Sequence, residues 1–288
     1  MAAGLVRTDV WSKRRLRAAD LAQRWPFAAE VLAFYTVLLD VQEQAFLAAL
    51  DDTPKADAIA AYAAERVLPR VIGVSVASGP PALVAAVVEQ FHEVDLTGMF
   101  TAWLRGDELS PVERYLARAA VGPLLEALGA AAREACGEPR DERHCPACGG
   151  LPQVGYFASS PEDLVTAHRY LVCARCAATW AYPRLTCAAC GESDTGKLEV
   201  YAEIGTTQAE LSGTIVKPGA APSAAAVDAR FPHLRIDGCR TCARYLLTVD
   251  LDRDPRAVPL VDEIAAIPLD LYAKERGLTK LVPNLMGL

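Results

Sequence analysis

The stretch Leu171–Gly191 reads LVCARCAATWAYPRLTCAACG and contains two Cys-x-x-Cys pairs that are 10 residues apart. A third pair lies 24 residues upstream of these two, and a fourth lies 48 residues downstream. In chain order the four pairs are Cys145/Cys148, Cys173/Cys176, Cys187/Cys190 and Cys239/Cys242. The ninth cysteine, Cys136, is the one outside this pattern. A single such pair is ambiguous between redox and metal chemistry, whereas four of them indicate metal sites.

The spacing of the pairs predicts how they combine. Two residues between paired cysteines let the chain turn so that both thiolates face one ion, and two such knuckles complete a tetrahedral four-cysteine site. A tandem arrangement joins the first pair to the second and the third to the fourth, while a cross-brace joins the first to the third and the second to the fourth. Strand-like segments lie within the 24- and 48-residue gaps, which favours tandem hairpins as in a zinc ribbon or rubredoxin. Site 1 then contains Cys145, Cys148, Cys173 and Cys176, and site 2 contains Cys187, Cys190, Cys239 and Cys242.

Four thiolates around a tetrahedral centre suit zinc and iron equally well, so we predict two metal ions, iron or zinc, one in each four-cysteine site. Four protein ligands leave no position for a substrate or an activated water, which favours a structural role over hydrolysis. Free buried thiols and a thioredoxin-like redox motif are the alternatives, although a thioredoxin fold needs only one such pair. We interpret Cys136 as a small buried apolar residue rather than a nucleophile.

The composition and the N-terminal region indicate the cellular compartment in which the protein lies. The 288 residues are 52% apolar and 23% charged, which excludes wholesale disorder. Arginines and Lys13 interrupt the first 17 residues, where a secretory signal would need an apolar core. The apolar stretch Val31–Leu39 has nine residues, against about 20 for a membrane span. We therefore expect a cytoplasmic protein with reduced thiols and no membrane span.

Residues 1–139 show the apolar spacing of amphipathic helices, for example in the segment Ala28–Leu39. Ser110-Pro111-Val112-Glu113 predicts a helix start with a capping box, and Gly122-Pro123 predicts a kink or a division of that helix. The final segment, Asp262–Gly277, again has helical spacing. Residues 218–226 are small and lack periodicity, which predicts a surface loop.

After Pro139 the pattern changes to short segments rich in aromatic and β-branched residues. The predicted strands are Val154–Ala158, Arg169–Val172, Thr179–Tyr182, Lys197–Ala202 and Tyr245–Leu251. We therefore predict an α+β multi-module protein with four parts. These are a helical bundle over 1–139, a first four-cysteine metal module over 140–186, a second over 187–251, and a C-terminal helix and tail over 252–288.

Four stretches together resemble the formate dehydrogenase accessory protein family, FdhE: Arg14–Gln44, Cys145–Gly150, Leu171–Gly191 and Asp237–Gly277. The resemblance implies a cytoplasmic, non-catalytic maturation factor with rubredoxin-like metal modules. It implies binding to the catalytic (large) subunit of respiratory formate dehydrogenase before export by the twin-arginine route. It also implies that the eight paired cysteines are metal ligands, with iron a possibility for the family. The segment between Cys190 and Cys239 is longer than the family pattern, so no role is carried over to residues 204–232.

Two other classes of function stay open: a zinc-ribbon protein that binds nucleic acid, and a rubredoxin-like electron-transfer protein. Nucleic-acid binding needs a cationic face for phosphates, but residues 140–250 carry 11 Lys and Arg against 12 Asp and Glu. We therefore expect no nucleic-acid partner. Electron transfer would leave the large helical region without a role.

Overall fold

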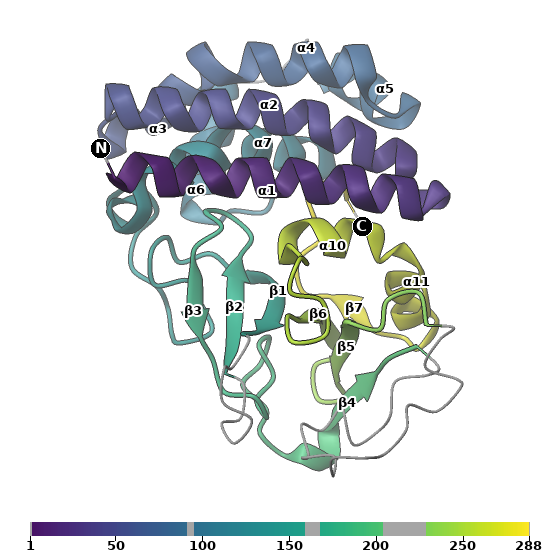
Figure 1. Ribbon diagram of the computed structural model, residues 1–288. Helices are drawn as coiled ribbons and strands as arrows, with labels where there is room; N and C mark the ends of the chain where they lie inside the picture. The colour runs from purple at the N-terminus through teal and green to yellow at the C-terminus, as the bar shows by residue number, and fades with distance from the viewer. Residues whose placement is uncertain (1, 91–94, 159–167, 204–228, 288) are drawn as a thin grey trace.

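The computed structural model describes residues 2–90, 95–158, 168–203 and 229–287. Within that part, the region before residue 139 is helical, which confirms the predicted N-terminal helical bundle. Figure 1 shows these helices as one layer, with α1 on the side that faces the rest of the chain. The helices are α1 (Ala2–Arg24), α2 (Ala29–Asp52), α3 (Ile59–Tyr62), α4 (Leu68–Ser78), α5 (Pro81–Gln90), α6 (Leu96–Arg105), α7 (Pro111–Leu128) and α8 (Ala132–Cys136). The predicted loop at 218–226 lies outside the described residues.

Helix α7 lies at the centre of this layer and packs against α2, α4, α5 and α6. It begins with the predicted capping box: the Ser110 hydroxyl accepts a hydrogen bond from the Glu113 N–H, and the Glu113 carboxylate accepts one from the Ser110 N–H. The helix is not divided at Gly122-Pro123, because it continues through Pro123 to its end at Leu128. Gly122 has a packing role instead, since a Cβ there would lie 3.2 Å from the Arg175 carbonyl oxygen.

The second layer is a mixed sheet with the order β3-β2-β1-β6-β5-β4, in which β7 also pairs with β6. The antiparallel pairs β1–β2 and β4–β5 lie within the 24- and 48-residue gaps, as the tandem arrangement predicts. The parallel pair β1–β6 joins the two halves, so both four-cysteine modules share one sheet. The strands are β1 (Pro152–Phe157), β2 (Arg169–Cys173), β3 (Thr179–Ala181), β4 (Leu198–Tyr201), β5 (Leu234–Cys239), β6 (Arg244–Asp250) and β7 (Thr279–Lys280). The four-part division of the chain stays a prediction.

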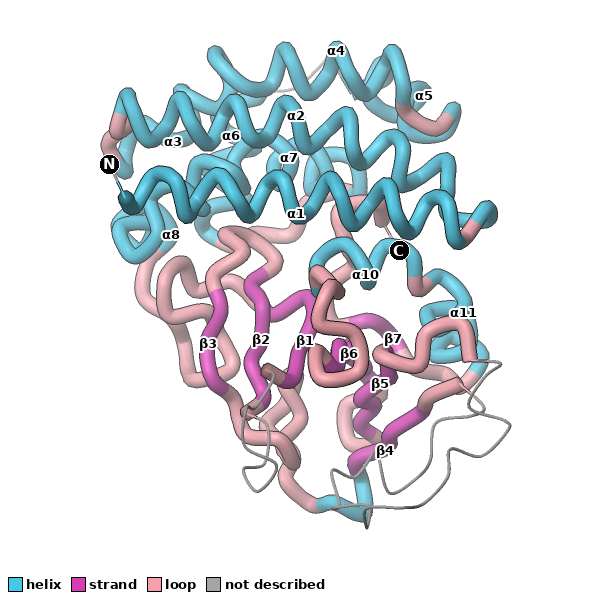
Figure 2. Tube along the Cα trace, in the orientation of Figure 1, coloured by secondary structure: helices cyan, strands magenta, loops and turns pink. Residues whose placement is uncertain are grey.

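The C-terminal region is helical, as predicted, and the helical stretch is divided into α10 (Pro259–Ala265) and α11 (Ile267–Glu275). The break falls at Ala266 because Pro268 occupies the first turn of α11 and has no N–H to continue α10. In Figure 2, α10 lies between the helical layer and the strands, and it contacts α1, β1 and β6. Buried residues of both layers belong to one continuous hydrophobic core.

An ion network fixes α1 to α10. The Arg17 guanidinium donates from Nε to both carboxylate oxygens of Asp262, at 3.0 and 3.1 Å, and from Nη2 to Asp254 at 2.7 Å. His233 Nε2 also lies 2.8 Å from Asp262. Because Arg17 and Asp262 are almost fully buried, this network holds the helical layer in a defined position over the sheet.

The segment Pro26–Asp52, which includes α2, is long and apolar enough to cross a membrane by length and composition alone. Half of its most apolar window is buried against the rest of the protein. A core helix of a globular protein passes the same test, and the packing of α2 against α1 and α7 fits that interpretation.

Candidate metal centres

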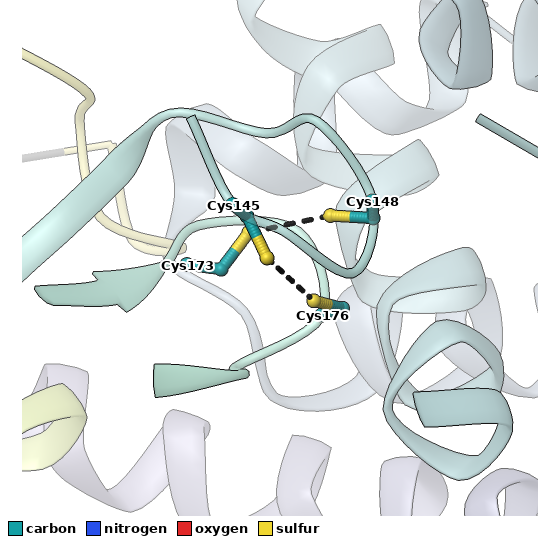
Figure 3. A group of neighbouring side chains, drawn as sticks. All are labelled: Cys145, Cys148, Cys173 and Cys176. Carbon is teal, nitrogen blue, oxygen red and sulfur yellow. Dashed lines mark hydrogen bonds between the residues drawn. The ribbon is translucent and has the colours of Figure 1, made fainter. Parts of the chain in front are cut away.

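The first two pairs form one cluster, which we call cluster 1 (Cys145, Cys148, Cys173 and Cys176). Its four sulfur atoms all lie within 4.8 Å of one another. Figure 3 shows them converging, with Sγ–Sγ distances of 3.6 Å for Cys145–Cys176 and 3.4 Å for Cys148–Cys173. One knuckle lies just before β1, and the other spans the end of β2 and the turn into β3. All four cysteines are buried.

The last two pairs form cluster 2 (Cys187, Cys190, Cys239 and Cys242), also within 4.8 Å. The Sγ–Sγ distances are 3.8 Å for both Cys187–Cys242 and Cys190–Cys239. Cys239 is buried at the end of β5, whereas the other three are partly exposed. The grouping is therefore tandem, as predicted, and the cross-brace is wrong. Because cluster 2 is more exposed than cluster 1, we expect a metal ion bound at cluster 2 to exchange faster.

Each knuckle has the same backbone form, which explains why these short loops fold as they do. The residue after the second cysteine is always left-handed: Gly149, Ala177, Gly191 and Ala243 have φ between 53° and 78°. This turn lets an N–H two residues after the first cysteine reach its sulfur, at Ala147, Arg175 and Ala189, over 3.3 to 3.4 Å. Such donors stabilise a thiolate. Glycine adopts this backbone at no steric cost, whereas Ala177 and Ala243 adopt it against the usual preference of residues with a Cβ.

The donor sets fit a metal ion. Four tetrahedral ligands with metal–sulfur bonds of about 2.3 Å have sulfur atoms about 3.8 Å apart, close to the observed distances. In cluster 1, hydrogen bonds from the neighbouring thiols lower the pKa of Cys145, while the same contacts raise the pKa of Cys176. In cluster 2, burial raises the pKa of Cys242. Crowded sulfurs cannot all become thiolates without a cation among them, and a divalent metal supplies that charge.

Gly150 shows how closely the chain packs around cluster 1. A Cβ at this position would lie 2.9 Å from Cys173 Sγ and 3.0 Å from Arg175 Cδ. We expect Gly150→Ala to displace that sulfur, to weaken metal binding at cluster 1 and to lower the free energy of unfolding by about 1–3 kcal/mol. Competition with a chromophoric chelator and thermal unfolding measure the two effects.

Gly73→Ala in α4 is the matched control, because nothing lies within 4 Å of its added Cβ. It should leave metal binding unchanged and stabilise the helix by about 0.5–1 kcal/mol. Retention of wild-type metal affinity in Gly150→Ala would show that the close approach to Cys173 is not critical.

Cys136 belongs to neither cluster and lies at the end of α8, beside Arg175. It is half-buried, and burial raises the pKa of its thiol to about 11, so the thiolate is scarce at neutral pH. This environment fits the predicted apolar role and does not suit a nucleophile.

Two regions of the chain match models of known protein families, and both regions contain cysteine pairs of the two clusters. Residues 144–184 match the family model described as FdhE, central domain, and residues 223–286 match the one described as FdhE, C-terminal domain. The chain thus contains two regions that are similar to FdhE domains. The resemblance seen in the sequence is thereby confirmed, with cluster 1 inside the FdhE central domain and Cys239 and Cys242 inside the FdhE C-terminal domain.

Individual FdhE proteins are also similar in sequence to this chain. The chain is 29% identical over 146 residues to the FdhE homolog of Aquifex aeolicus, covering 51% of this chain and 42% of that protein. It is 31% identical over 142 residues to the homolog of Pseudomonas aeruginosa, covering 49% and 38%. The aligned part therefore spans about two fifths of these curated relatives.

The fold extends the likeness further. The crystal structure of the FdhE protein from Pseudomonas aeruginosa superimposes with a TM-score of 0.60 at 24% identity, over 96% of this chain and 95% of that one. At this identity the match shows a shared fold, including the helical layer that the two family domains leave out.

Proposed function

We propose that this protein is a non-catalytic, cytoplasmic accessory protein that binds the catalytic subunit of a respiratory formate dehydrogenase before its twin-arginine export. We further propose that the eight paired cysteines hold two metal ions, iron or zinc, one in each cluster. Two FdhE domains in one chain, with the FdhE fold over nearly all of it, support the accessory role.

The observation that carries the proposal is the closure of both clusters. Each supplies four sulfur ligands, so a tetrahedral ion bound there has no position for a substrate. A metal in such a site supplies folding free energy and rigidity. Backbone N–H groups of the knuckles donate hydrogen bonds to the sulfur atoms and so hold them in position. The shared sheet fixes the two clusters relative to each other beneath the helical layer. The result is a rigid surface suited to holding another protein.

The test is an anaerobic pull-down with the tagged full chain, from cells that express formate dehydrogenase, with metal analysis of the same sample. We expect co-purification of the catalytic subunit and about two metal ions per chain. Gly73→Ala in α4 is the control, because its added Cβ meets nothing within 4 Å, and it should capture the subunit as well as the wild type does.

Three outcomes would overturn the proposal. Wild-type protein that captures no catalytic subunit would remove the accessory role. Salt-dependent retention of nucleic acid instead would favour a zinc-ribbon nucleic-acid protein. Reversible reduction of the bound metal by a partner, with turnover, would favour electron transfer.

A further inference from the structure

A cavity of about 260 Å³ lies between the helical layer and the knuckles of cluster 1. Its walls include the α6–α7 connection, the end of α8 and the loops that carry Gly149, Gly150 and Arg175. Five arginines from four parts of the chain line it, and we call it the arginine cavity: Arg105, Arg114, Arg118, Arg140 and Arg175. The acidic residues on its walls are Asp107 and Glu138, and Glu138 lies 3.4 Å from Arg133.

Three of these arginines hydrogen-bond to uncharged backbone carbonyls, although Glu263 also attracts Arg118 electrostatically. Arg114, Arg118 and Arg175 each donate a hydrogen bond to a backbone carbonyl, at 3.1, 2.9 and 3.3 Å. Arg105 and Arg140 are exposed. Among the described residues, no carboxylate forms an ion pair with any of the five. Because the chain as a whole carries a net charge of −7, this concentration of positive charge is local.

Arg175 is fixed in place more firmly than a surface arginine. Its guanidinium lies 5.3 Å from the centre of the Trp103 ring and donates to the Leu104 carbonyl. Two glycines make room for it, since a Cβ at Gly106 or at Gly150 would lie 3.0 Å from its side chain. Its own N–H donates to Cys173 Sγ at 3.3 Å. Its guanidinium is thus preorganised by α6, and its backbone is held by cluster 1.

We propose that the arginine cavity binds the carboxylates of an acidic peptide segment, and that this segment belongs to the client protein. The identity of the client rests on the proposed function, while the chemistry of the site does not. Guanidinium groups form paired hydrogen bonds with carboxylates. The exposed Arg105 and Arg140 are accessible to an incoming chain, and the apolar side chains of Leu109, Leu151 and Val282 on the same walls suit a peptide better than a free inorganic ion.

The experiment measures fluorescence anisotropy of a fluorescein-labelled decaglutamate peptide with the metal-loaded full chain. We expect saturable binding that weakens as salt is added, and that is weakened at least about tenfold in the double variant Arg105→Glu/Arg140→Glu. Arg66→Glu, an exposed arginine of the helical layer away from the cavity, is the control and should change binding less than about twofold. Circular dichroism checks that the variants fold.

Equal binding by the double variant and the Arg66→Glu control would overturn the site. Displacement of the peptide by an equal concentration of inorganic phosphate would also overturn it, since the cavity would then be a phosphate site. Capture of the catalytic subunit by the wild type tests the proposed function separately, because the decaglutamate measurement does not depend on the client.

Discussion

Replacing Cys173 by serine is expected to remove one of the two metal ions per chain and to lower the free energy of unfolding by several kcal/mol. Cys173 is 1% exposed and lies at the end of β2, in contact with the Cys148 sulfur and with Gly150. A serine hydroxyl is a poor ligand for a thiolate-selective ion. Structural zinc sites supply on the order of 10 kcal/mol of folding free energy, so a weakened site loses a substantial part of it. Metal analysis and chemical unfolding measure the two losses.

Four cysteine-to-serine variants test which cysteines bind the same metal ion. Cys145→Ser should lose the same ion as Cys173→Ser, and Cys187→Ser should lose the other one, because the sulfurs are grouped in tandem. Cys136→Ser should keep both ions. Loss of different ions in Cys145→Ser and Cys173→Ser would contradict the arrangement of the clusters, and retention of both ions in Cys173→Ser would contradict its role as a ligand.

The features that the sequence could predict are those fixed by short-range patterns. A helix period of 3.6 residues and a capping box at Ser110 are local, and so is the turn of a Cys-x-x-Cys knuckle. The tandem grouping followed from the strand-like segments between the pairs. Of the seven strands in the described part of the chain, five were placed within one to two residues of their observed ends.

The remaining strands depended on distant partners. β7 has only two residues and exists because Thr279 and Lys280 pair with β6. The sequence of β5 shows the alternation expected of a strand, since Leu234 and Ile236 are buried and the residues between and directly after them are less so. However, β5 follows a long stretch without periodicity. The parallel pairing of β1 with β6 joins residues more than 90 positions apart, and no local pattern encodes it.

The buried charges were the least predictable part of the molecule. Lysine and glutamate are exposed in most proteins, so a sequence gives no reason to place Lys280, Glu263 and Asp270 together in the interior. Glu263 lies on α10 and Asp270 on α11, and Lys280 of β7 forms an ion pair with both. The same limitation applies to the arginine cavity, which gathers side chains from four separate segments.

Replacing Lys280 by methionine is expected to lower the free energy of unfolding by about 3–5 kcal/mol, because it leaves two buried carboxylates without their cation. Lys280 Nζ lies 2.7 Å from Glu263 and 3.1 Å from Asp270, and all three side chains are at most 4% exposed. Lys274→Met, at an exposed position of α11, is the control and should change stability by less than about 0.5 kcal/mol.

The pH dependence of the Lys280→Met variant distinguishes lost charge pairing from lost packing. Burial raises the pKa of Glu263 above its ordinary value of 4.5, and Lys280 opposes that shift, so removing the lysine raises this pKa further. Folding then takes up a proton, and the stability of the variant falls as the pH rises from 4.5 through the raised pKa.

In the wild type, burial lowers the pKa of Lys280, but Glu263 and Asp270 outweigh burial and raise that pKa above 10.5. The stabilising charge of Lys280 is therefore complete at neutral pH and is lost only above that value. Chemical unfolding at about pH 6 and about pH 8 should therefore show a larger deficit at the higher pH. A deficit that is equal at both would mean that the lysine acts through its packing alone.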